Sequence, residues 1–182
     1  MREQYLGVIL DEAERMNKLV RRLLTLSQLE SEHPDLNLEV FDLRESAESV
    51  LRKTQVLAEE SGAKSLLLAP KEALLVRADA FRIDEVLMNY VSNAYHHVSE
   101  GGEVRLSLRV EGERAHCEVF NSGKPIPEAD LERVFEKFYK VDKAHTRKYG
   151  GSGIGLSIVR AIMTQHNMPC GVRNAENGVV FW

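Results

Sequence analysis

The 182-residue sequence lacks any hydrophobic run that approaches the length of a membrane span, and it has only two cysteines, Cys117 and Cys170. A membrane-spanning helix needs about 18 or more consecutive apolar residues. The N-terminus is not followed by the apolar segment of a signal peptide. Two distant cysteines without metal-ligand spacing argue against a disulfide framework or a zinc site, and they are typical of a reducing compartment.

The sequence also lacks an excess of positive charge, because its net charge is -4 and its pI is about 5.9. A strongly basic nucleic-acid binder is therefore excluded, and we expect no nucleic-acid partner. A hydrophobic fraction of 43% provides enough apolar surface for a folded core. The length allows one full domain plus a small appendage.

The longest periodic segment covers residues 2–30, which contain no proline and a single glycine, Gly7. Apolar residues recur there at spacings of three and four, which predicts one long amphipathic helix. Its apolar face is wide, so we expect a partner, either a neighbouring helix or a second copy of the chain. An ordinary core helix is the alternative. Residues 31–35 predict a break and a hinge.

From residue 37 onward, strand and helix patterns interleave without strict alternation. We expect strands at 37–41, 65–69, 73–77, 103–111, 114–120, 170–174 and 178–182. We expect helices at 42–61, from Asp79 to Val98, from Pro127 to Phe138, and from about 153 to 167. The fold predicted is α+β: a two-layer α/β sandwich whose mixed sheet is covered by helices on one face, with the long helix at the N-terminus.

A polar stripe lies on the predicted helix that Asp79 begins. Glu85, Asn89, Asn93 and then His96 or His97 follow at steps of three or four residues, which places them on one face. Asparagine is a poor residue for a helix interior, so two on one face need a reason. A solvated face is the alternative. Paired amides suit Mg²⁺, which takes oxygen ligands and usually keeps waters and substrate phosphates.

A glycine-rich segment precedes the last predicted helix, where residues 150–155 hold four of the twelve glycines. Such a helix start offers free N–H groups and a positive dipole to an anion. The pattern is neither a Walker A loop nor a Rossmann turn. The flanking residues 133–148 contain six basic and two acidic side chains, which is typical of a lid over a polyphosphate. A hinge and a solvated loop are the alternatives.

The segment that begins at Asn121 directly follows a predicted strand. The Asn121 amide can accept a hydrogen bond from an exocyclic amine and donate one to a ring nitrogen. Gly123 would let a flat ring approach the backbone. The alternative is a plain turn, because Asn, Gly and Pro are common turn residues.

In this order and spacing, the segments resemble the ATP-binding domain of sensor histidine kinases, within the gyrase, histidine kinase and MutL superfamily with its Bergerat-type fold. Residues 84–97 resemble the N box, 121–126 the first glycine box, 135–140 the F box and 151–156 the second glycine box. Residues 1–30 resemble the second helix of the dimerisation and phosphotransfer hairpin. The resemblance implies a partial hairpin at 1–32 and a catalytic ATP-binding domain at 33–182.

The resemblance implies ATP and Mg²⁺ as cofactors, with a metal ligand at Asn93 and catalytic residues at Asn89, Glu85 and His96. Asn121 would recognise the adenine amine, and residues 139–150 would form the ATP lid. The predicted ATP-binding residues are Asn89, Asn93, His96, Asn121, Gly123, Ile126, Tyr139, Lys140, Lys143, Arg147, Gly151, Gly153, Ile154, Gly155 and Leu156.

Two departures from the family pattern affect the expected binding. The adenine-binding residue is usually Asp, and because Asn121 is a neutral acceptor we expect modest ATP affinity. Position 96 is commonly Lys, and because it is histidine here, a phosphate contact at His96 would depend on pH.

A third departure concerns the phosphate acceptor. The family's acceptor histidine precedes an acidic residue and, a few positions later, a proline; none of the six histidines here has that context. We therefore expect this chain not to autophosphorylate. The implied partners are ATP or ADP, the phosphoacceptor hairpin of the same kinase, a response regulator and a second copy of the kinase. The implied location is the cytoplasmic part of a membrane-anchored receptor.

Three alternatives differ in chemistry. A hydrolysing ATPase of the same superfamily would place a glutamate four residues before the metal asparagine, but Asn89 stands there and cannot act as a base. An anti-sigma-type serine kinase shares the boxes but should lack the helix at 2–30. A nucleotide-gated, non-catalytic dimerisation module would use that helix without phosphoryl transfer.

Overall fold

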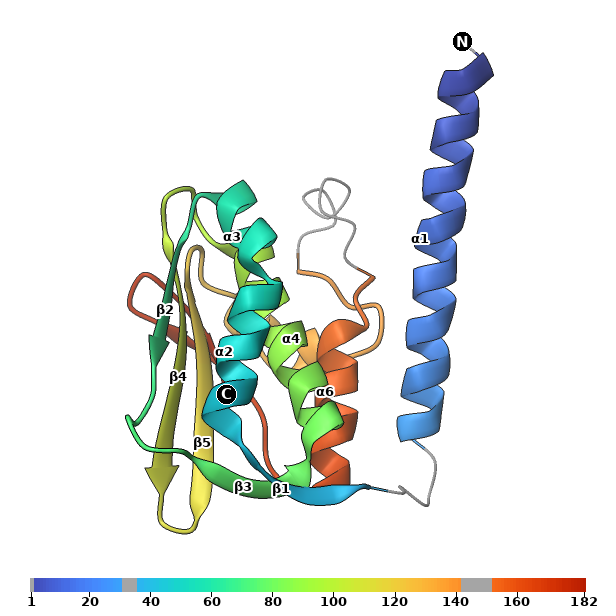
Figure 1. Ribbon diagram of the computed structural model, residues 1–182. Helices are drawn as coiled ribbons and strands as arrows, with labels where there is room; N and C mark the ends of the chain where they lie inside the picture. The colour runs from blue at the N-terminus through green and yellow to red at the C-terminus, as the bar shows by residue number, and fades with distance from the viewer. Residues whose placement is uncertain (1, 31–35, 142–151) are drawn as a thin grey trace.

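The computed structural model describes residues 2–30, 36–141 and 152–182, which form an α/β body with a long helix beside it (Figure 1). In chain order the elements are α1 (Arg2–Leu29), β1 (Leu38–Asp42), α2 (Leu43–Lys53), α3 (Gln55–Ser61), β2 (Lys64–Leu68), β3 (Leu75–Asp79), α4 (Ala80–His97), β4 (Glu103–Glu111), β5 (Arg114–Ser122), the 3-10 turns η1 (Glu128–Asp130) and η2 (Arg133–Phe135), α6 (Gly155–Gln165), β6 (Val172–Ala175) and β7 (Gly178–Phe181).

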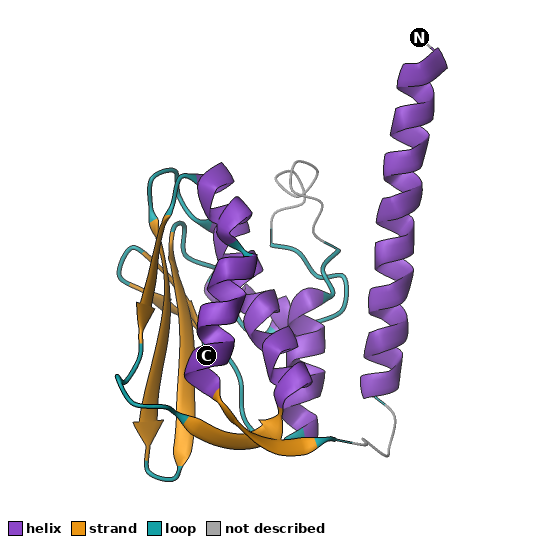
Figure 2. Ribbon diagram, in the orientation of Figure 1, coloured by secondary structure: helices purple, strands orange, loops and turns teal. Residues whose placement is uncertain are grey.

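The described strands form two sheets. The larger has five strands in the order β2-β4-β5-β7-β6, and the smaller pairs β1 with β3. β2 runs parallel to β4, whereas the other neighbours are antiparallel. Helices α2, α4 and α6 all lie on one side of the five-stranded sheet (Figure 2). The predicted two-layer sandwich with a mixed sheet is therefore confirmed.

The core lies between that sheet and the helices. Val104, Leu106 and Val119 point inward from β4 and β5 and are fully buried. They belong to the same hydrophobic cluster as Val91 of α4 and Ile162 of α6. Because side chains alternate along a strand, the residues between them face the opposite, outer side of the sheet.

Two aspartates start helices as the sequence predicts. Asp79 Oδ1 accepts from Arg82 N at 3.1 Å, and Asp79 Oδ2 accepts from Asn37 N at 3.0 Å. Asp42 Oδ1 accepts from Arg44 N and from Leu74 N, each at 2.9 Å. Each carboxylate therefore caps a helix and also holds a second segment of chain against the helix start.

Two predicted helices differ from the structure. The helix expected at 42–61 is divided at Thr54, whose hydroxyl donates to Val50 O at 2.9 Å and competes with the regular helical ladder. The helix expected from Pro127 to Phe138 is wrong, because the chain forms η1 and η2 there. Asn174 of β6 explains the difference in part, since its side chain hydrogen-bonds both backbone groups of Ile126 at 2.8 Å and fixes the entry to this segment.

Helix α1 is attached to the body through its C-terminal turns. Leu26 and Leu29 are buried and join the main core. Gln165 Nε2 donates to Leu29 O at 2.6 Å, and Lys137 Nζ pairs with Glu30 Oε2 at 2.7 Å. The hinge expected at 31–35 lies outside the described residues, so the domain boundary at 32 and 33 stays a prediction.

The N-terminal half of α1 extends beyond the body (Figure 1). Along α1 an apolar stripe is exposed, made of Ile9, Leu10, Met16, Val20 and Leu24. Among the described residues, no helix combines the length and the apolar character that crossing a membrane requires.

Candidate functional site

A cavity of about 450 Å³ opens between α4, the end of β5 and the start of α6. This volume lies within the range of small-molecule sites. The described residues that line it are Arg22, Asn89, Ser92, Asn93, His96, His97, Asn121, Lys124, Pro125, Ile126, Pro127, Val134, Tyr139, Lys140, Val141, Ser152, Gly153, Gly155, Leu156, Val179 and Phe181. All four sequence motifs contribute to this list.

The polar stripe of α4 forms one wall. Asn89, Asn93 and His96 line the cavity, as the sequence predicts. Asn89 Nδ2 donates to Glu85 O at 2.8 Å. The carboxylate of Glu85 is not part of the lining and instead pairs with Arg82 Nη1 at 3.2 Å. Its catalytic role stays a prediction.

Asn121 lies on β5 at the inner end of the cavity and is only 2% exposed. Its neighbours across the sheet are Val104 and Val179. The Asn121 amide donates a long hydrogen bond, 3.4 Å, to Ser122 O. Burying an amide is costly unless its hydrogen bonds are completed. A ligand that supplies an amine or a ring nitrogen would complete them.

Two glycines at this site have close neighbours on α4. A Cβ at Gly123 would lie 2.8 Å from His97 O, at the end of α4. A Cβ at Gly155 would lie 2.8 Å from Asn89 Oδ1. A side chain at either position would therefore collide with α4, and at position 155 it would displace a lining residue. Gly123 itself does not line the cavity, and neither does Ile154, which is fully buried.

A backbone hydrogen bond closes the ends of the predicted lid. Phe138 N donates to Gly153 O at 2.8 Å. Both residues have positive φ, 63° for Phe138 and 70° for Gly153, and a Cβ at position 153 would lie 3.0 Å from Phe138 backbone atoms. Phe138 and Gly153, which flank the predicted lid in sequence, are therefore held next to each other. Lys143, Arg147 and Gly151 lie outside the described residues.

Tyr139 and Lys140 line the cavity at this same point. The Tyr139 hydroxyl donates to Asp130 Oδ1 at 2.6 Å, and the Arg133 guanidinium lies 4.2 Å from the centre of its ring. The hydrogen bond to Asp130 raises the pKa of Tyr139, so the phenol is neutral at physiological pH. Tyr139 therefore offers the cavity an uncharged aromatic surface.

The lining is positively charged. Arg22, Lys124 and Lys140 contribute to it, and the described lining residues include no Asp or Glu. Burial lowers the pKa of His96, and the nearby positive charge of Arg22 lowers it further. His96 is therefore neutral at physiological pH and would gain charge only in more acidic solution. An anion is the ligand that this electrostatic environment favours.

The arrangement fits an adenine nucleotide with Mg²⁺. The described residues hold no cluster of three or more His, Cys, Asp or Glu that could bind a metal ion without help. Asn93 offers an amide oxygen, and Mg²⁺ characteristically combines few protein ligands with substrate phosphates and waters. The glycine-bearing start of α6 lies on the same cavity as the buried amide of Asn121.

Sequence reasoning missed several lining residues, of which Arg22 and Lys124 are the charged ones. Lys124 lies inside the first glycine box and could have been included on that basis. Arg22 gives no local signal, because residues 1–30 resemble a helix of the dimerisation hairpin and not a nucleotide-binding motif. Only the tertiary contact between α1 and the body brings it to the cavity.

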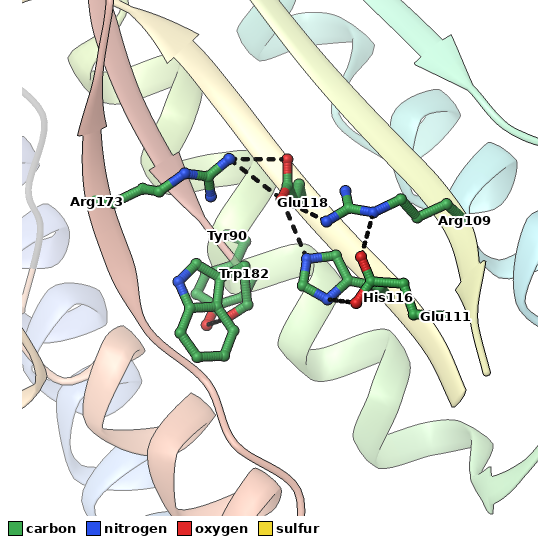
Figure 3. Close-up of polar contacts among 7 residues, drawn as sticks. All are labelled: Tyr90, Arg109, Glu111, His116, Glu118, Arg173 and Trp182. Carbon is green, nitrogen blue, oxygen red and sulfur yellow. Dashed lines mark hydrogen bonds and ion pairs between the residues drawn. The ribbon is translucent and has the colours of Figure 1, made fainter. Parts of the chain in front are cut away.

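A second polar cluster lies on the outer face of the same sheet (Figure 3). Glu118 accepts hydrogen bonds from Arg109, Arg173 and His116 at 3.1 to 3.2 Å. Burial alone would raise the pKa of Glu118, but these hydrogen bonds lower it to about 2. The Arg109 guanidinium also pairs with Glu111 at 2.7 Å. These side chains bind one another and are not part of the cavity lining.

Comparison with known families gives one domain match. The family described as histidine kinase-, DNA gyrase B- and HSP90-like ATPases matches residues 78–182, more than half of the chain. The sensor histidine kinase WalK of Bacillus subtilis is 36% identical over 165 residues, which is 90% of this chain and 27% of that protein. The chain therefore spans about a quarter of the length of that curated relative.

Solved structures show the same fold. The catalytic domain of the histidine kinase ThkA aligns with a TM-score of 0.72 at 32% identity, over 80% of this chain and 92% of that one. ThkA in complex with the response regulator protein TrrA aligns over 100% of this chain and 50% of that chain, with a TM-score of 0.79 at 28% identity. The resemblance and the fold class inferred from the sequence are confirmed.

Proposed function

Because the chain belongs to the family of histidine kinase-, DNA gyrase B- and HSP90-like ATPases, we propose that it binds ATP with Mg²⁺ and transfers the γ-phosphate to a histidine of a dimerisation hairpin. The observation that carries this proposal is the convergence of four motifs, distant in sequence, on one cavity of about 450 Å³. Phosphoryl transfer depends mainly on positioning and charge neutralisation, which such a site can provide.

The inner end of the cavity takes the adenine in this proposal. The buried Asn121 amide accepts a hydrogen bond from the adenine amine. Gly123, which is outside the lining, lets the chain after Asn121 pack closely against the end of α4. Ile126 and Leu156 supply apolar surface at the cavity. Because Asn121 is neutral, its hydrogen bond is weaker than that of an aspartate, and modest affinity is expected.

The outer end takes the phosphates and the metal ion. Asn93 is the proposed Mg²⁺ ligand, and Asn89 lies near the triphosphate. Bound Mg²⁺ neutralises phosphate charge and holds the phosphate oxygens in place. Lys124 and Lys140 add positive charge, and Gly153 and Gly155 allow the backbone at the start of α6 to approach the anion. Glu85 and His96 are also proposed as catalytic residues. The remaining proposed ATP-binding residues are His96, Ile154, Lys143, Arg147 and Gly151.

The residue at position 89 supports transfer over hydrolysis. Asn89 occupies the position where hydrolysing relatives place a base, and its Nδ2 donates to Glu85 O at 2.8 Å. An amide cannot take a proton from water at physiological pH. The cavity therefore has no base at this position to activate water, and transfer to a protein acceptor is the proposed reaction.

The proposed partners are the phosphoacceptor hairpin, a response regulator and a second copy of the chain. The exposed apolar stripe of α1 supports pairing with another helix. ThkA, at 28% identity, has been solved with a response regulator. We expect this chain alone not to autophosphorylate, because none of its six histidines has the acceptor context. A cytoplasmic position in a membrane-anchored receptor remains a prediction.

Two other functions remain to be separated by experiment. The exposed apolar stripe of α1 favours a nucleotide-gated dimerisation module as the second candidate, whereas an anti-sigma-type serine kinase would have little use for this helix. A module of the former kind would bind nucleotide without transferring phosphate. A serine kinase would label a protein substrate on serine, and acid-stable label would identify it.

The binding test is calorimetry with a non-hydrolysable ATP analogue and Mg²⁺. We expect the wild-type chain to bind and Asn93→Ala to lose the Mg²⁺-dependent part of the affinity. Asn17→Ala, an exposed asparagine on α1, is the matched control and should bind normally. Failure of the wild-type chain to bind any adenine nucleotide would contradict the proposal.

The transfer test supplies a separate dimerisation hairpin that carries its own histidine. We expect labelled phosphate from ATP to appear on that hairpin in acid-labile form, and none on this chain. Normal nucleotide binding without any transfer would instead support the non-catalytic module. Label on this chain in the absence of the hairpin would contradict the expected lack of autophosphorylation.

A further inference from the structure

Arg22 lines the cavity although it lies on α1, outside the segments that resemble the ATP-binding motifs. Its Nη1 donates to Ser152 Oγ at 3.2 Å. Ser152 is three residues before Gly155, where α6 begins. A guanidinium from a helix outside the body is thus held at the glycine-bearing edge of the site.

The position of Arg22 follows from how α1 packs. Arg22, Leu26 and Leu29 are spaced four and three residues apart, so they share one face of the helix. Leu26 and Leu29 are buried in the body, and Glu30 pairs with Lys137 at 2.7 Å. Arg22 is therefore on the docking face, two turns before the attached end, and any tilt of α1 would change its distance from the cavity.

The surroundings of Arg22 favour an anion. Lys124 and Lys140 line the same cavity, and the described lining residues contain no carboxylate. The positive charge of Arg22 contributes to the lowered pKa of His96 on α4. Its charge therefore acts within the site and is not confined to its contact with Ser152. A planar guanidinium is well suited to phosphate, because its N–H groups match two phosphate oxygens.

We propose that Arg22 binds the polyphosphate of a bound adenine nucleotide, exchanging the Ser152 hydroxyl for phosphate oxygens, so that nucleotide binding and docking of α1 stabilise each other. The inference rests on the proposed nucleotide site and adds a ligand from the helix to it. A phosphate oxygen is a stronger acceptor than a neutral hydroxyl. By thermodynamic linkage, whatever strengthens α1 docking also strengthens nucleotide binding.

The test compares Arg22→Gln with Arg22→Lys and the wild-type chain. Calorimetry measures the binding of ADP, of a non-hydrolysable ATP analogue with Mg²⁺, and of adenosine. Loss of one charge-assisted hydrogen bond is expected to weaken binding of ADP and of the ATP analogue about tenfold in Arg22→Gln. Adenosine binding should not change. Arg22→Lys should recover part of the lost affinity, because lysine keeps the positive charge but lacks the planar guanidinium that can bind two phosphate oxygens.

Arg21→Gln is the matched control, because Arg21 is the exposed neighbour on α1 and is not part of the lining. It should bind all three ligands as the wild-type chain does. Thermal unfolding of each variant checks that the fold is intact, which is expected for an exposed helical position.

Docking is measured separately by amide hydrogen exchange in residues 19–29. Addition of ADP should slow exchange there in the wild-type chain and in Arg21→Gln, and the effect should be lost in Arg22→Gln. This readout reports on the helix and not on affinity, so a residue that merely filled space in the cavity would not change it.

Several outcomes would overturn the inference. Unchanged ADP affinity in Arg22→Gln would exclude the phosphate contact, and tighter binding would show that Arg22 blocks the site. Equal weakening of adenosine and ADP would show an effect on the pocket in general. In each case the wild-type chain still binds, so the proposed nucleotide site stands. Absence of wild-type binding would overturn both.

Discussion

Asn121 and Glu118 lie three residues apart on β5 and face opposite sides of one sheet. On the outer side, Glu118 is held by Arg109, Arg173 and His116, so its charge is balanced within the protein (Figure 3). On the inner side, Asn121 is 2% exposed and borders a cavity. Within the described part of the chain its side chain makes one hydrogen bond, to Ser122 O, and that bond is long, at 3.4 Å.

This difference indicates that a ligand binds on the inner side of the sheet and not on the outer side. Polar groups that bind one another add stability and leave little for a ligand to satisfy. A buried amide at the edge of a cavity offers hydrogen bonds that a ligand can complete. Substitutions on the inner side should therefore change binding more than stability, and those on the outer side should do the reverse.

The largest effect on the inner side is expected for Gly155→Val. A Cβ at this position would lie 2.8 Å from Asn89 Oδ1, and the added methyl groups would enlarge the collision. We expect affinity for an ATP analogue to fall about 100-fold, or ~2.8 kcal/mol, in calorimetry. Gly7→Val is the matched control, because a Cβ at Gly7 meets nothing within 4 Å. Wild-type affinity in Gly155→Val would contradict the placement of the ligand.

Gly178→Ala should lower both stability and nucleotide affinity, unlike the other substitutions. A Cβ on Gly178 would overlap the backbone oxygen of Asn121 and the ring of Phe120, on the neighbouring strand β5. Because β5 and β7 would have to move apart, we expect a loss of about 1–3 kcal/mol in the free energy of unfolding. Denaturant unfolding measures this loss. Nucleotide affinity should fall with it, since Asn121 moves, and unchanged stability would contradict the close packing.

Asn121→Asp sharpens the comparison because it places a charge on the inner side. A carboxylate accepts a stronger hydrogen bond from an amine, so we expect ATP-analogue affinity to rise about fivefold. The ligand-free protein should be less stable, because a carboxylate at a position only 2% exposed loses hydration. Calorimetry tests the expected rise in affinity, and thermal unfolding tests the expected loss of stability. Weaker binding would count against contact with adenine.

The smallest effect is expected for Glu118→Gln on the outer side. Its hydrogen bonds lower the pKa of Glu118 from 4.5 to about 2, so the charged form stabilises the fold above pH 4.5 and the contribution is lost as the pH falls toward 2. Near neutral pH the variant should lose about 1 kcal/mol or less, as exposed ion pairs do. The difference from the wild-type protein should shrink on acidification.

Unfolding in urea at several pH values measures that difference. Glu113→Gln, at the exposed turn between β4 and β5, is the control and should show no such dependence. Nucleotide binding should be unchanged in both variants. A difference that grew on acidification would contradict the assigned ion pairs.

Sequence patterns predicted most of the fold where local signals and packing agree. Asp79 caps α4 as expected, and the β4–β5 hairpin has its turn at Gly112. The prediction failed where a side chain distant in sequence determines the backbone conformation. Asn174 holds Ile126 from a strand almost fifty residues away, and no local pattern around Pro127 reveals that contact.

The candidate site shows the same limit. The motif residues Asn89, Asn93 and Asn121 line one cavity, as the resemblance to the histidine kinase ATP-binding domain implies. Arg22 could not be predicted, because its place depends on the packing of α1 against α6 and not on its neighbours in sequence.

The attachment of α1 at one end gives it the mechanics of a lever. Its fulcrum is the buried pair Leu26 and Leu29, and at 1.5 Å per residue the free arm back to Arg2 is about 36 Å long. A rocking motion of about 10° would therefore sweep the far end through ~6 Å but move the backbone at Arg22 by only ~1 Å. A large displacement at the N-terminal end of α1 therefore becomes a small one at Arg22, and a shift of that size is enough to form or break a hydrogen bond.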